Sequence, residues 1–517
     1  MPLDLDPDIR RIELLPGERW WGGAIRDGIH APFGKTSYEC DLHEHTGNQS
    51  APLLLSSKGR VIWGEHPFHF RFEPGAVEII HTGHKIRLNQ PARNLAGAYR
   101  AACAKWFPFS GQIPQALAFT APQYNTWIEM KYEPTQEKVL DYAKRILAEG
   151  FPPGILMIDD NWMNDYGDWT FHRERFPDPK SMVAALHKMG FKLMLWVCPY
   201  VSPDSALGRG LLARKFVLKW KNGEPLLKKW WNGYSMLLDF THPEALSWFK
   251  ERLDVLVHQF KIDGFKFDAG DPLASELDLA WHKRPAPSED CEKYAQFGLH
   301  WHLSEFRECW KCGGEALIQR QRDKHHSWKR DGGLQSLIPN GSAQSLVGHA
   351  FHCPDMIGGG LDGDFNAPDF KLDAELFVRY AQCAALFPMM QFSLAPWKAV
   401  SGKAMEAVKQ AVKLRMEFGP RILQLAQNAS ETGEPILRPM EYAFPGQGLE
   451  EVDQQFMLGE EILVAPVVEK GATERKIVFP EGEWKNAQGS TFTGPATQSV
   501  EAPLGVLPWF QRVSRGG

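Results

Sequence analysis

The chain has 517 residues, 58 Lys and Arg against 63 Asp and Glu, a formal net charge of −5 and 43% hydrophobic residues. The nearly balanced charge excludes the extended basic surface of a protein that binds nucleic acid or anionic lipid, and the hydrophobic content excludes disorder on a large scale. The length exceeds one compact core and predicts a large domain with one or two smaller ones. The 19 Trp and 31 Phe fit either an aromatic-rich core or surfaces that stack on sugar rings.

The beginning of the chain is predicted to be a β-domain. Its first 18 residues contain no apolar core of a signal peptide, and no later stretch approaches a membrane span, so we expect a soluble, cytoplasmic protein with no membrane partner. Short alternating runs separated by Gly, Pro and Asn follow and are typical of an antiparallel sandwich; they lie at residues 51–56, 60–63, 68–72 and 77–80. We place this N-terminal β-sandwich at residues 1–110, with a helix near 95–106.

From residue 116 the pattern changes to alternating strands and helices. The predicted helices cover residues 137–149, 181–189, 243–260, 291–309, 334–346, 372–385 and 404–427. The predicted strands cover residues 116–120, 154–160, 192–197, 264–267, 316–323, 349–355, 389–393 and 436–440. Eight strands alternating with helices predict an α/β fold, a (β/α)₈ TIM barrel with insertions, which we place at residues 111–442.

The remaining residues, 443–517, return to short strands with Gly and Pro turns. They predict a small C-terminal β-sandwich packed on the barrel. Eight scattered cysteines indicate reduced, buried thiols, and Cys309 with Cys312 is the one close pair. Because a second CxxC and a metal-spaced histidine pair are missing from the sequence, we expect no metal site.

Residues 262–271, IDGFKFDAGD, end an apolar run in carboxylates and a glycine. Asp268 follows the predicted strand 264–267, at the end where catalytic groups of a parallel barrel collect. Lys266 lies on the same face of the strand, and its charge would hold Asp268 ionised. The alternative is that Asp268 caps the next helix and forms a surface pair with Lys266.

Asp323 ends the next predicted strand in the same way. We expect adjacent parallel strands to bring Asp268 and Asp323 to neighbouring points on one rim, and two such carboxylates are the groups that cleave glycosides. A separation of roughly 5 Å predicts retention of configuration, and roughly 6.5–9.5 Å predicts inversion. Repulsion at this range would raise the pKa of one of them, which suits a general acid. The alternative for Asp323 is an ion pair with Arg320, Arg322 or Lys324.

Signatures of other chemistries are missing from the sequence. We find no GxGxxG after a strand, no Walker loop, no GxSxG elbow and no HExxH. The pair Asp159 and Asp160 has oxygens that suit Mg²⁺, but further oxygen ligands are not identifiable. We therefore expect no metal and no cofactor.

Several motifs occur in a fixed order: IDDNWM at residues 158–163, GFKFDAGD at 264–271, Asp323 five residues before Trp328, and HAFHCPDMIGG at 349–359. Together they resemble glycoside hydrolase family 31, and the similarity runs from about residue 125 to residue 510. The resemblance implies an N-terminal β-sandwich, a (β/α)₈ barrel, C-terminal β-structure and retaining α-glycosidase activity. It implies Asp268 as nucleophile and Asp323 as acid and base.

Within the family, the segments YNTWIE at 124–129, KFDAGD, PDMIGG and MQFS at 390–393 most resemble the branch with α-galactosidases and the myogenesis-regulating glycosidase. Two family histidines are replaced, by Pro354 and in the region 391–393, which argues against glucose specificity. The resemblance implies that ring hydroxyls are held by Asp159, Asp160, Lys266, Arg320 and Asp355. We interpret Trp127, Trp196 and Trp231 as pocket walls, with plain core as the alternative.

The resulting prediction is a retaining exo-α-glycosidase, most like an α-galactosidase, that acts on a small oligosaccharide or glycoside. The alternatives are an α-glucosidase or α-xylosidase of the same family, a transglycosylase, and an inactive carbohydrate-binding protein. The sequence indicates no nucleic-acid partner and leaves a homo-oligomer open.

Overall fold

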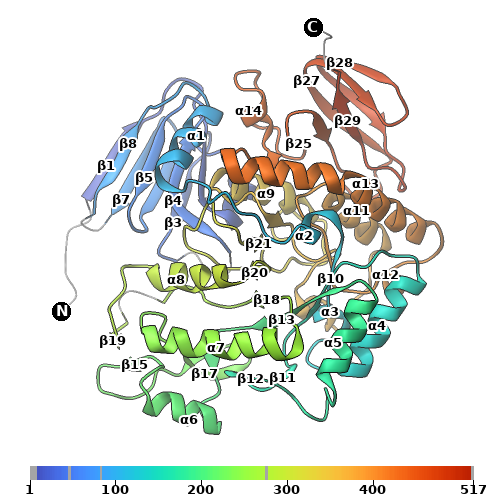
Figure 1. The fold of residues 1–517 in the computed structure, drawn as a ribbon. Helices are drawn as coiled ribbons and strands as arrows, with labels where there is room; N and C mark the ends of the chain where they lie inside the picture. The colour runs from blue at the N-terminus through green and yellow to red at the C-terminus, as the bar shows by residue number, and fades with distance from the viewer. Residues whose placement is uncertain (1–7, 45–47, 82–83, 274–276, 514–517) are drawn as a thin grey trace.

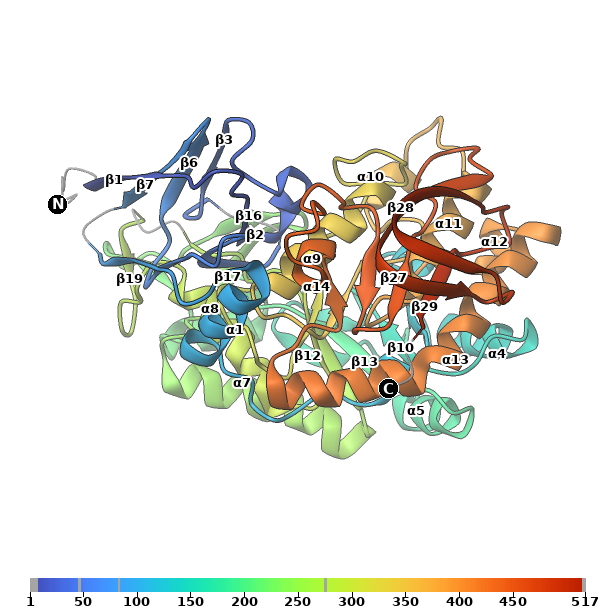
Figure 2. The same cartoon turned by 90° about the horizontal axis from the view of Figure 1, so that it is seen from above.

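The computed structural model describes residues 8–44, 48–81, 84–273 and 277–513. A barrel of parallel strands forms the body of the molecule, and two antiparallel β-regions lie over the same side of it (Figure 1). The view from above separates the N-terminal β-region from the C-terminal one (Figure 2). Within the described residues, no helix is long and apolar enough to cross a bilayer.

The N-terminal β-region consists of two four-stranded antiparallel sheets. One has the order β1-β7-β6-β3 and the other β2-β4-β5-β8. Apolar side chains of both sheets, such as Leu54, Ile62, Phe70 and Ile79, share one buried core, which confirms the predicted sandwich. The strands are β1 (Asp8–Glu13), β2 (Trp20–Ala24), β3 (Tyr38–Asp41), β4 (Ser50–Ser56), β5 (Val61–Gly64), β6 (His69–Glu73), β7 (Ala76–His81) and β8 (Ile86–Asn89).

The predicted (β/α)₈ barrel is confirmed. Its eight parallel strands have the order β22-β21-β20-β18-β13-β10-β9-β23. The two ends meet where Ile357 N donates to Gln391 O at 2.8 Å. The strands are β9 (Gln123–Asn125), β10 (Ile155–Ile158), β13 (Lys192–Val197), β18 (Gly264–Phe267), β20 (Ser304–Phe306), β21 (Ile318–Arg320), β22 (His352–Cys353) and β23 (Gln391–Phe392).

Two of the predicted barrel strands are wrong. Residues 116–120 contain the short helix α2 (Leu117–Thr120), and residues 436–440 contain β24 (Leu437–Arg438), which pairs with β25 outside the barrel. Their places are taken by β9 and by β20. Since β20 lies inside the predicted helix 291–309, that helix is also wrong beyond its first part: α8 covers Glu289–Phe297.

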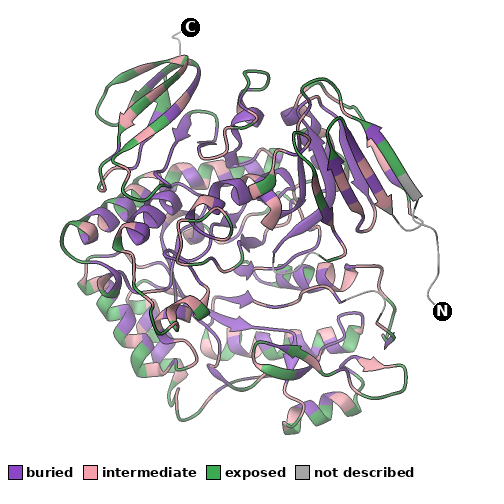
Figure 3. Cartoon of the chain, turned by 180° about the vertical axis from the view of Figure 1, so that it is seen from behind, coloured by how far each residue is buried: buried purple, intermediate pink, exposed green. Residues whose placement is uncertain are grey.

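Helices cover the outside of the barrel, and buried residues concentrate in its strands and on the inner faces of these helices (Figure 3). The longest, α13 (Gly402–Thr432), packs against α11 and α2. Besides α8, the other helices with eight or more residues are α1 (Leu95–Trp106), α4 (Gln136–Ala148), α5 (Pro179–Lys188), α6 (Ala206–Ala213), α7 (Pro243–Phe260), α9 (Leu337–Leu346) and α11 (Ala374–Ala385). Shorter helices include α3 (Trp127–Met130), α10 (Asp362–Phe365), α12 (Pro396–Ala399) and α14 (Met440–Ala443).

Insertions after β10 and β13 build up the rim at the carboxyl ends of the strands. The first is the hairpin of β11 (Met163–Asp165) and β12 (Asp168–Phe171). The second is a three-stranded sheet of order β14-β17-β16, formed by β14 (Tyr200–Val201), β16 (Lys228–Trp230) and β17 (Gly233–Leu237). A further pair joins β15 (Lys219–Trp220) to β19 (Leu279–Ala280).

The C-terminal β-region contains a six-stranded antiparallel sheet of order β24-β25-β26-β29-β27-β28. Met457, Phe479, Trp484 and Phe510 belong to its separate buried core. The strands besides β24 are β25 (Phe456–Leu458), β26 (Ile462–Val464), β27 (Glu474–Asn486), β28 (Thr491–Glu501) and β29 (Trp509–Arg512). The predicted limits of the three domains stay a prediction.

Candidate active site

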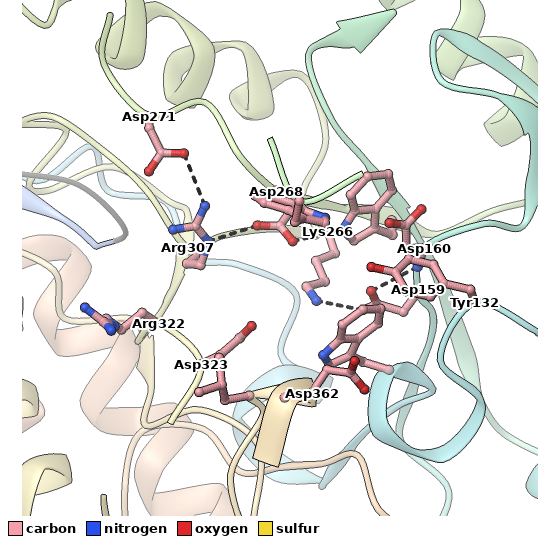
Figure 4. A pocket seen from close by; sticks show the side chains of 15 residues that line it. Tyr132, Asp159, Asp160, Lys266, Asp268, Asp271, Arg307, Arg322, Asp323 and Asp362 are labelled. Atoms are coloured by element: carbon pink, nitrogen blue, oxygen red, sulfur yellow. Dashed lines mark hydrogen bonds and ion pairs between the residues drawn. The ribbon is translucent and has the colours of Figure 1, made fainter. Parts of the chain in front are cut away.

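A cavity of about 610 Å³ lies at the carboxyl ends of the barrel strands. Most of the predicted site residues line it, from strands far apart in the sequence (Figure 4). Those that do are Trp127, Asp159, Asp160, Trp196, Trp231, Lys266, Asp268 and Asp323. Tyr132, Asp271, Arg307, Arg322, Leu361, Asp362 and Gly363 complete the lining.

Asp268 follows β18 and is fixed on both sides of its carboxylate. Its Oδ2 accepts a hydrogen bond from Trp196 Nε1 at 3.0 Å, and its Oδ1 accepts one from Arg307 Nε at 3.0 Å. The chain turns sharply just beyond it at Gly270, where φ is +79° and a Cβ would stand 2.2 Å from the ring of Tyr294. A glycine is therefore required for the loop that presents this carboxylate.

The surroundings of Asp268 favour its charged form. Burial alone would raise its pKa, but the charges of Arg307 and Lys266 and the hydrogen bond from Trp196 outweigh burial and hold the pKa well below its ordinary value. Asp268 is therefore a carboxylate at neutral pH, with its oxygens presented toward the cavity (Figure 4).

The direct partner of Lys266 is Asp159. Lys266 Nζ donates to Asp159 Oδ2 at 2.6 Å, and both side chains are buried. Burial favours the neutral amine, yet the charge of Asp159 keeps the pKa of Lys266 above its ordinary value. Lys266 acts on Asp268 through its charge, while the ion pair with Asp268 is made by Arg307.

Asp323 reaches the cavity from the loop after β21. Arg320 Nη1 donates to Asp323 Oδ1 at 2.8 Å, so the ion pair with Arg320 that was the alternative interpretation of Asp323 is present. The expectation that Asp268 and Asp323 follow adjacent strands is wrong, because β20 lies between β18 and β21. Both side chains still point into the same cavity (Figure 4). The intervening strand, β20, is followed by Arg307, which lines the cavity beside them.

Arg320 and Asp355 lie behind Asp323 and do not line the cavity. Arg320 Nη1 also donates to Asp355 Oδ1 at 2.5 Å, and both side chains are buried. Asp355 Oδ2 accepts from Lys324 N at 2.7 Å. Burial and the charge of Asp323 raise the pKa of Asp355 to about 7, although Arg320 opposes them. Arg320 thus binds both carboxyl groups, and Asp355 helps to fix the guanidinium that holds Asp323.

Asp160 is a second buried carboxyl of the cavity, held by two hairpins. It accepts hydrogen bonds from Tyr166 Oη, between β11 and β12, and from Asn232 Nδ2 at 2.9 Å, between β16 and β17. Burial and the charge of Asp159 raise its pKa to about 7. In the described part of the chain, no three or more His, Cys, Asp or Glu side chains are grouped so as to hold a metal ion.

The three predicted tryptophans differ in exposure. Trp196 is buried beneath Asp268, whereas Trp231, on the rim, is 50% exposed. Trp127 Nε1 donates to Gly360 O at 2.9 Å, and this bond fixes the ring in the wall of the cavity. Trp127 and Trp231 leave aromatic surface in the cavity, of the kind that sugar rings stack on.

Arg307 is the main site residue that the sequence predictions missed. It follows β20 directly, and the signal that it shares with Asp268 is a charged residue immediately after a barrel strand. Because residues 291–309 were predicted as one helix, Arg307 was not placed on the rim. Asp271 was missed as well, and its Oδ2 accepts from Arg307 Nη2 at 3.4 Å.

Pro354 and the region 391–393, where the two family histidines are replaced, are buried and lie outside the lining of the cavity. Gln391 is occupied by Gln123, Asn125 and Glu305 inside the barrel.

Two family models match the chain. Residues 112–425 match the glycosyl hydrolases family 31 TIM-barrel domain, and residues 433–515 match the glycosyl hydrolase family 31 C-terminal domain. The first match covers the strands that form the cavity. The second match covers the strands from β24 to β29.

Curated relatives match over shared segments. The myogenesis-regulating glycosidase of Mus musculus is 34% identical over 500 residues, which cover 94% of this chain and 67% of that protein. Alpha-glucosidase 2 of Bacillus thermoamyloliquefaciens is 25% identical, covering 73% and 50%. The sulfoquinovosidase of Escherichia coli (strain K12) is 25% identical, covering 67% and 53%. The chain thus spans half to two thirds of the length of these relatives.

Solved structures share the fold. A GH31 alpha-xylosidase from a soil metagenome, complexed with xylose, has a TM-score of 0.86 at 22% identity, covering 98% of this chain and 81% of that one. A GH31 sulfoquinovosidase from E. rectale also has a TM-score of 0.86, at 17% identity, covering 98% and 82%. At these identities the likeness establishes the architecture alone.

Proposed function

Since the chain belongs to glycoside hydrolase family 31, we propose that it is a retaining exo-α-glycosidase that works through a covalent glycosyl-Asp268 intermediate. The observation that carries this proposal is the pairing of a buried, ionised Asp268 with a second carboxyl, Asp323, across one cavity. A nucleophile and a proton donor that face the same space are the two groups that retaining cleavage needs.

In the first step, Asp268 attacks the anomeric carbon while Asp323 gives its proton to the departing glycosidic oxygen. The bond from that carbon to the aglycone breaks as the bond to Asp268 forms. In the second step, Asp323 takes a proton from water, whose oxygen displaces Asp268 and restores its carboxylate. Arg320 binds Oδ1 of Asp323 and leaves Oδ2 for the transferred proton.

The sugar ring is proposed to bind at the end of the cavity that holds Asp159, Asp160 and Lys266. The buried pair of Lys266 and Asp159 presents fixed charges, and hydrogen bonds between charged groups and hydroxyls are strong where water is excluded. Trp127 would supply a stacking surface. Arg320 and Asp355, behind the wall, would act on the ring through Asp323.

We further propose that terminal α-galactosides are the preferred substrates. Galactose differs from glucose at C4 alone, and a site whose buried polar groups fit one epimer leaves them unpaired with the other. Asp159, Asp160 and Trp127 are the groups proposed to face that carbon. A tenfold preference requires only about 1.4 kcal/mol, which one such hydrogen bond supplies.

The test is a panel of 4-nitrophenyl α-glycosides of galactose, glucose, xylose, sulfoquinovose and N-acetylgalactosamine, assayed in one buffer. We expect kcat/KM for the galactoside to exceed that for the glucoside about tenfold or more, and NMR to show the α-anomer as the first product. A glucoside or xyloside preference would replace the galactosidase proposal and leave the mechanism standing. Formation of the β-anomer first would overturn retention.

Two other functions are decided by the same panel. A transglycosylase would form a new glycoside in place of free sugar at high acceptor concentration. An inactive carbohydrate-binding protein would cleave none of the glycosides. A cytoplasmic location and the oligomeric state stay predictions from the sequence.

A further inference from the structure

The cavity contains one cation that differs from the others. Lys266 is paired with Asp159, and Arg307 is paired with Asp268 and Asp271. Arg322 also lines the cavity and is exposed. Within the residues that the structure describes, its guanidinium forms no hydrogen bond and no ion pair.

Arg322 occupies the end of the cavity away from the proposed sugar site. In Figure 4, Asp159, Asp160 and Lys266 lie toward one end and Arg322 toward the other, with Asp268 and Asp323 between them. If Asp323 protonates the departing oxygen, the space beyond it belongs to the aglycone. A group that meets Arg322 is therefore part of the leaving group.

The charges around Arg322 leave its own charge uncompensated. Arg320 and Lys324, each two residues from Arg322 along the chain, are buried basic residues. Burial lowers the pKa of Lys324 to about 7, the charge of Asp355 opposes this shift, and the charge of Arg322 acts in the same direction as burial. The nearby acids have partners of their own: Asp271 binds Arg307, and Asp323 binds Arg320.

Asp362 lines the cavity on the other side of Asp323 from Arg322, and its carboxylate lies 3.1 Å from Lys131 Nζ (Figure 4). Asp271, Asp323 and Asp362 each have a cationic partner other than Arg322, so the guanidinium of Arg322 stays available to an anion that enters the cavity beside it.

We propose that Arg322 is the anchor of an aglycone subsite for an anionic group, so that the preferred substrates carry a carboxylate or a tetrahedral oxyanion on the leaving group. This inference rests on the proposed glycosidase function and adds the chemical class of the aglycone. A guanidinium offers a planar pair of N–H donors that binds either anion in a two-point contact.

The experiment compares aryl glycosides of one sugar, the best in the nitrophenyl panel, with three leaving groups: 4-carbamoylphenyl, 4-carboxyphenyl and 4-sulfophenyl. The first is neutral and close in shape to the second, and the third carries a tetrahedral oxyanion. We expect kcat/KM of the wild type to be about three- to tenfold higher for at least one anionic substrate than for the neutral one. The preferred anion then tells a carboxylate-bearing aglycone from one with a phosphate- or sulfate-like group.

Variants assign the preference to Arg322. Arg322→Gln should reduce the ratio to about one, Arg322→Lys should retain part of it, and added salt should compress the wild-type ratio. Arg252→Gln, an exposed position on the outer helix α7, is the matched control and should leave the ratio unchanged. Because the readout is a ratio within each variant, a general loss of activity next to Asp323 does not affect it.

The outcomes separate this inference from the proposed function. Turnover of the neutral substrate without a preference for either anion, or with a preference that persists in Arg322→Gln, overturns the anionic subsite and leaves the glycosidase standing. No turnover of any glycoside overturns the glycosidase and this inference with it.

Discussion

Asp268 and Asp323 differ in how their oxygens are occupied. Both oxygens of Asp268 accept hydrogen bonds, and its side chain is 14% exposed. Asp323 is 33% exposed, and among the described residues its Oδ2 has no hydrogen-bond donor. A carboxylate that is fixed and charged suits attack on carbon, and one with a free, wetter oxygen suits proton transfer.

The first prediction concerns Asp268→Asn. The amide keeps the shape and can still accept from Trp196, so folding should persist, but it cannot form the ester intermediate. We expect kcat/KM for the preferred nitrophenyl glycoside to fall by several orders of magnitude with a thermal midpoint near that of the wild type. Asp141→Asn, 64% exposed on α4, serves as the control. Near wild-type turnover by Asp268→Asn would remove Asp268 from the role of nucleophile.

The second prediction concerns Asp323→Ala. Substrates with poor leaving groups need a proton on the departing oxygen, whereas activated aryl glycosides do not, so the former should lose far more activity. Azide should partly restore turnover of the activated substrate, because it attacks the intermediate without a base. The measurement is kcat/KM for a disaccharide and a nitrophenyl glycoside with and without azide. Equal losses with no azide effect would assign Asp323 a binding role.

The third prediction follows from the raised pKa of Asp160. Its carboxyl titrates near 4 when unfolded and at about 7 when folded. Between these values the folded protein holds a proton that the unfolded chain has released, so this contribution to stability is complete below about pH 4 and is lost as pH rises through 7. Relative to Asp160→Asn, the wild type should lose about 2–4 kcal/mol of unfolding free energy between pH 4 and 8. The measurement is urea unfolding of the wild type and of Asp160→Asn at pH 4 and pH 8. A difference in unfolding free energy between the two proteins that is the same at both pH values contradicts the prediction.

At the scale of elements, the rim hairpins position Asp160. Tyr166 stands between β11 and β12 and Asn232 between β16 and β17; Asn232 Nδ2 donates to both Asp160 Oδ2 and Tyr166 Oη, at 2.9 and 2.6 Å. A single amide therefore joins two insertions to one carboxyl on the cavity floor. Neither hairpin belongs to the barrel, yet both hold the side chain of Asp160, which follows the barrel strand β10.

The fourth prediction is that Asn232→Ala loosens this arrangement. Losing a donor to the carboxylate should raise the pKa of Asp160 further and weaken sugar binding, so KM should rise several-fold with a smaller change in kcat. In the pH profile of kcat/KM, the transition that reports the ionisation of Asp160 should move to higher pH. Asn164→Ala is the control, because Asn164 is exposed and its amide bonds Thr170. An unchanged KM and pH profile would show that the hairpins contribute stability alone.

The sequence predicts elements well where they are long or end in a marked residue. The helix expected at 243–260 and the strand at 264–267 match α7 and β18 in both bounds. It fails for β9 and β20, whose three residues, QYN and SEF, contain one aromatic residue each and do not form an apolar run. The helical spacing of α8 also extends past Phe297 by chance, and this extension concealed β20.

At the scale of the whole molecule, the side chain of Gln49 connects the N-terminal β-region to the backbone of Arg307 and Arg320. Gln49 precedes β4, is fully buried, and its Nε2 donates to Arg307 O at 2.7 Å and to Arg320 O at 2.8 Å. Gln344 Nε2 in turn donates to Gln49 Oε1 at 3.0 Å. Gln49, from the N-terminal β-region, therefore bonds the backbone carbonyls of the two arginines that hold Asp268 and Asp323.

Contacts of this kind are beyond sequence reasoning from local patterns. Carboxylates after strands can be placed on a rim because parallel strands share their direction, and this is how Asp159, Asp268 and Asp323 were brought together. Gln49 lies more than 250 residues from Arg307 and Arg320 in the chain, and nothing in its neighbourhood distinguishes it from a surface glutamine. Its role follows from how the sandwich docks on the barrel.

The fifth prediction is that Gln49→Leu impairs both stability and catalysis. Leucine fills a similar volume but leaves two buried carbonyls without donors, which should cost about 1–3 kcal/mol of unfolding free energy. Because Arg307 and Arg320 would then hold their carboxylates less firmly, kcat should fall several-fold while KM changes less. Gln90→Leu, which removes an exposed bond to Lys58 O in the same β-region, should leave both unchanged. If Gln49→Leu reduced stability but kept the kcat of the wild type, the contact between the β-region and the barrel would contribute to stability alone, because Arg307 and Arg320 would then keep their geometry without the bonds from Gln49.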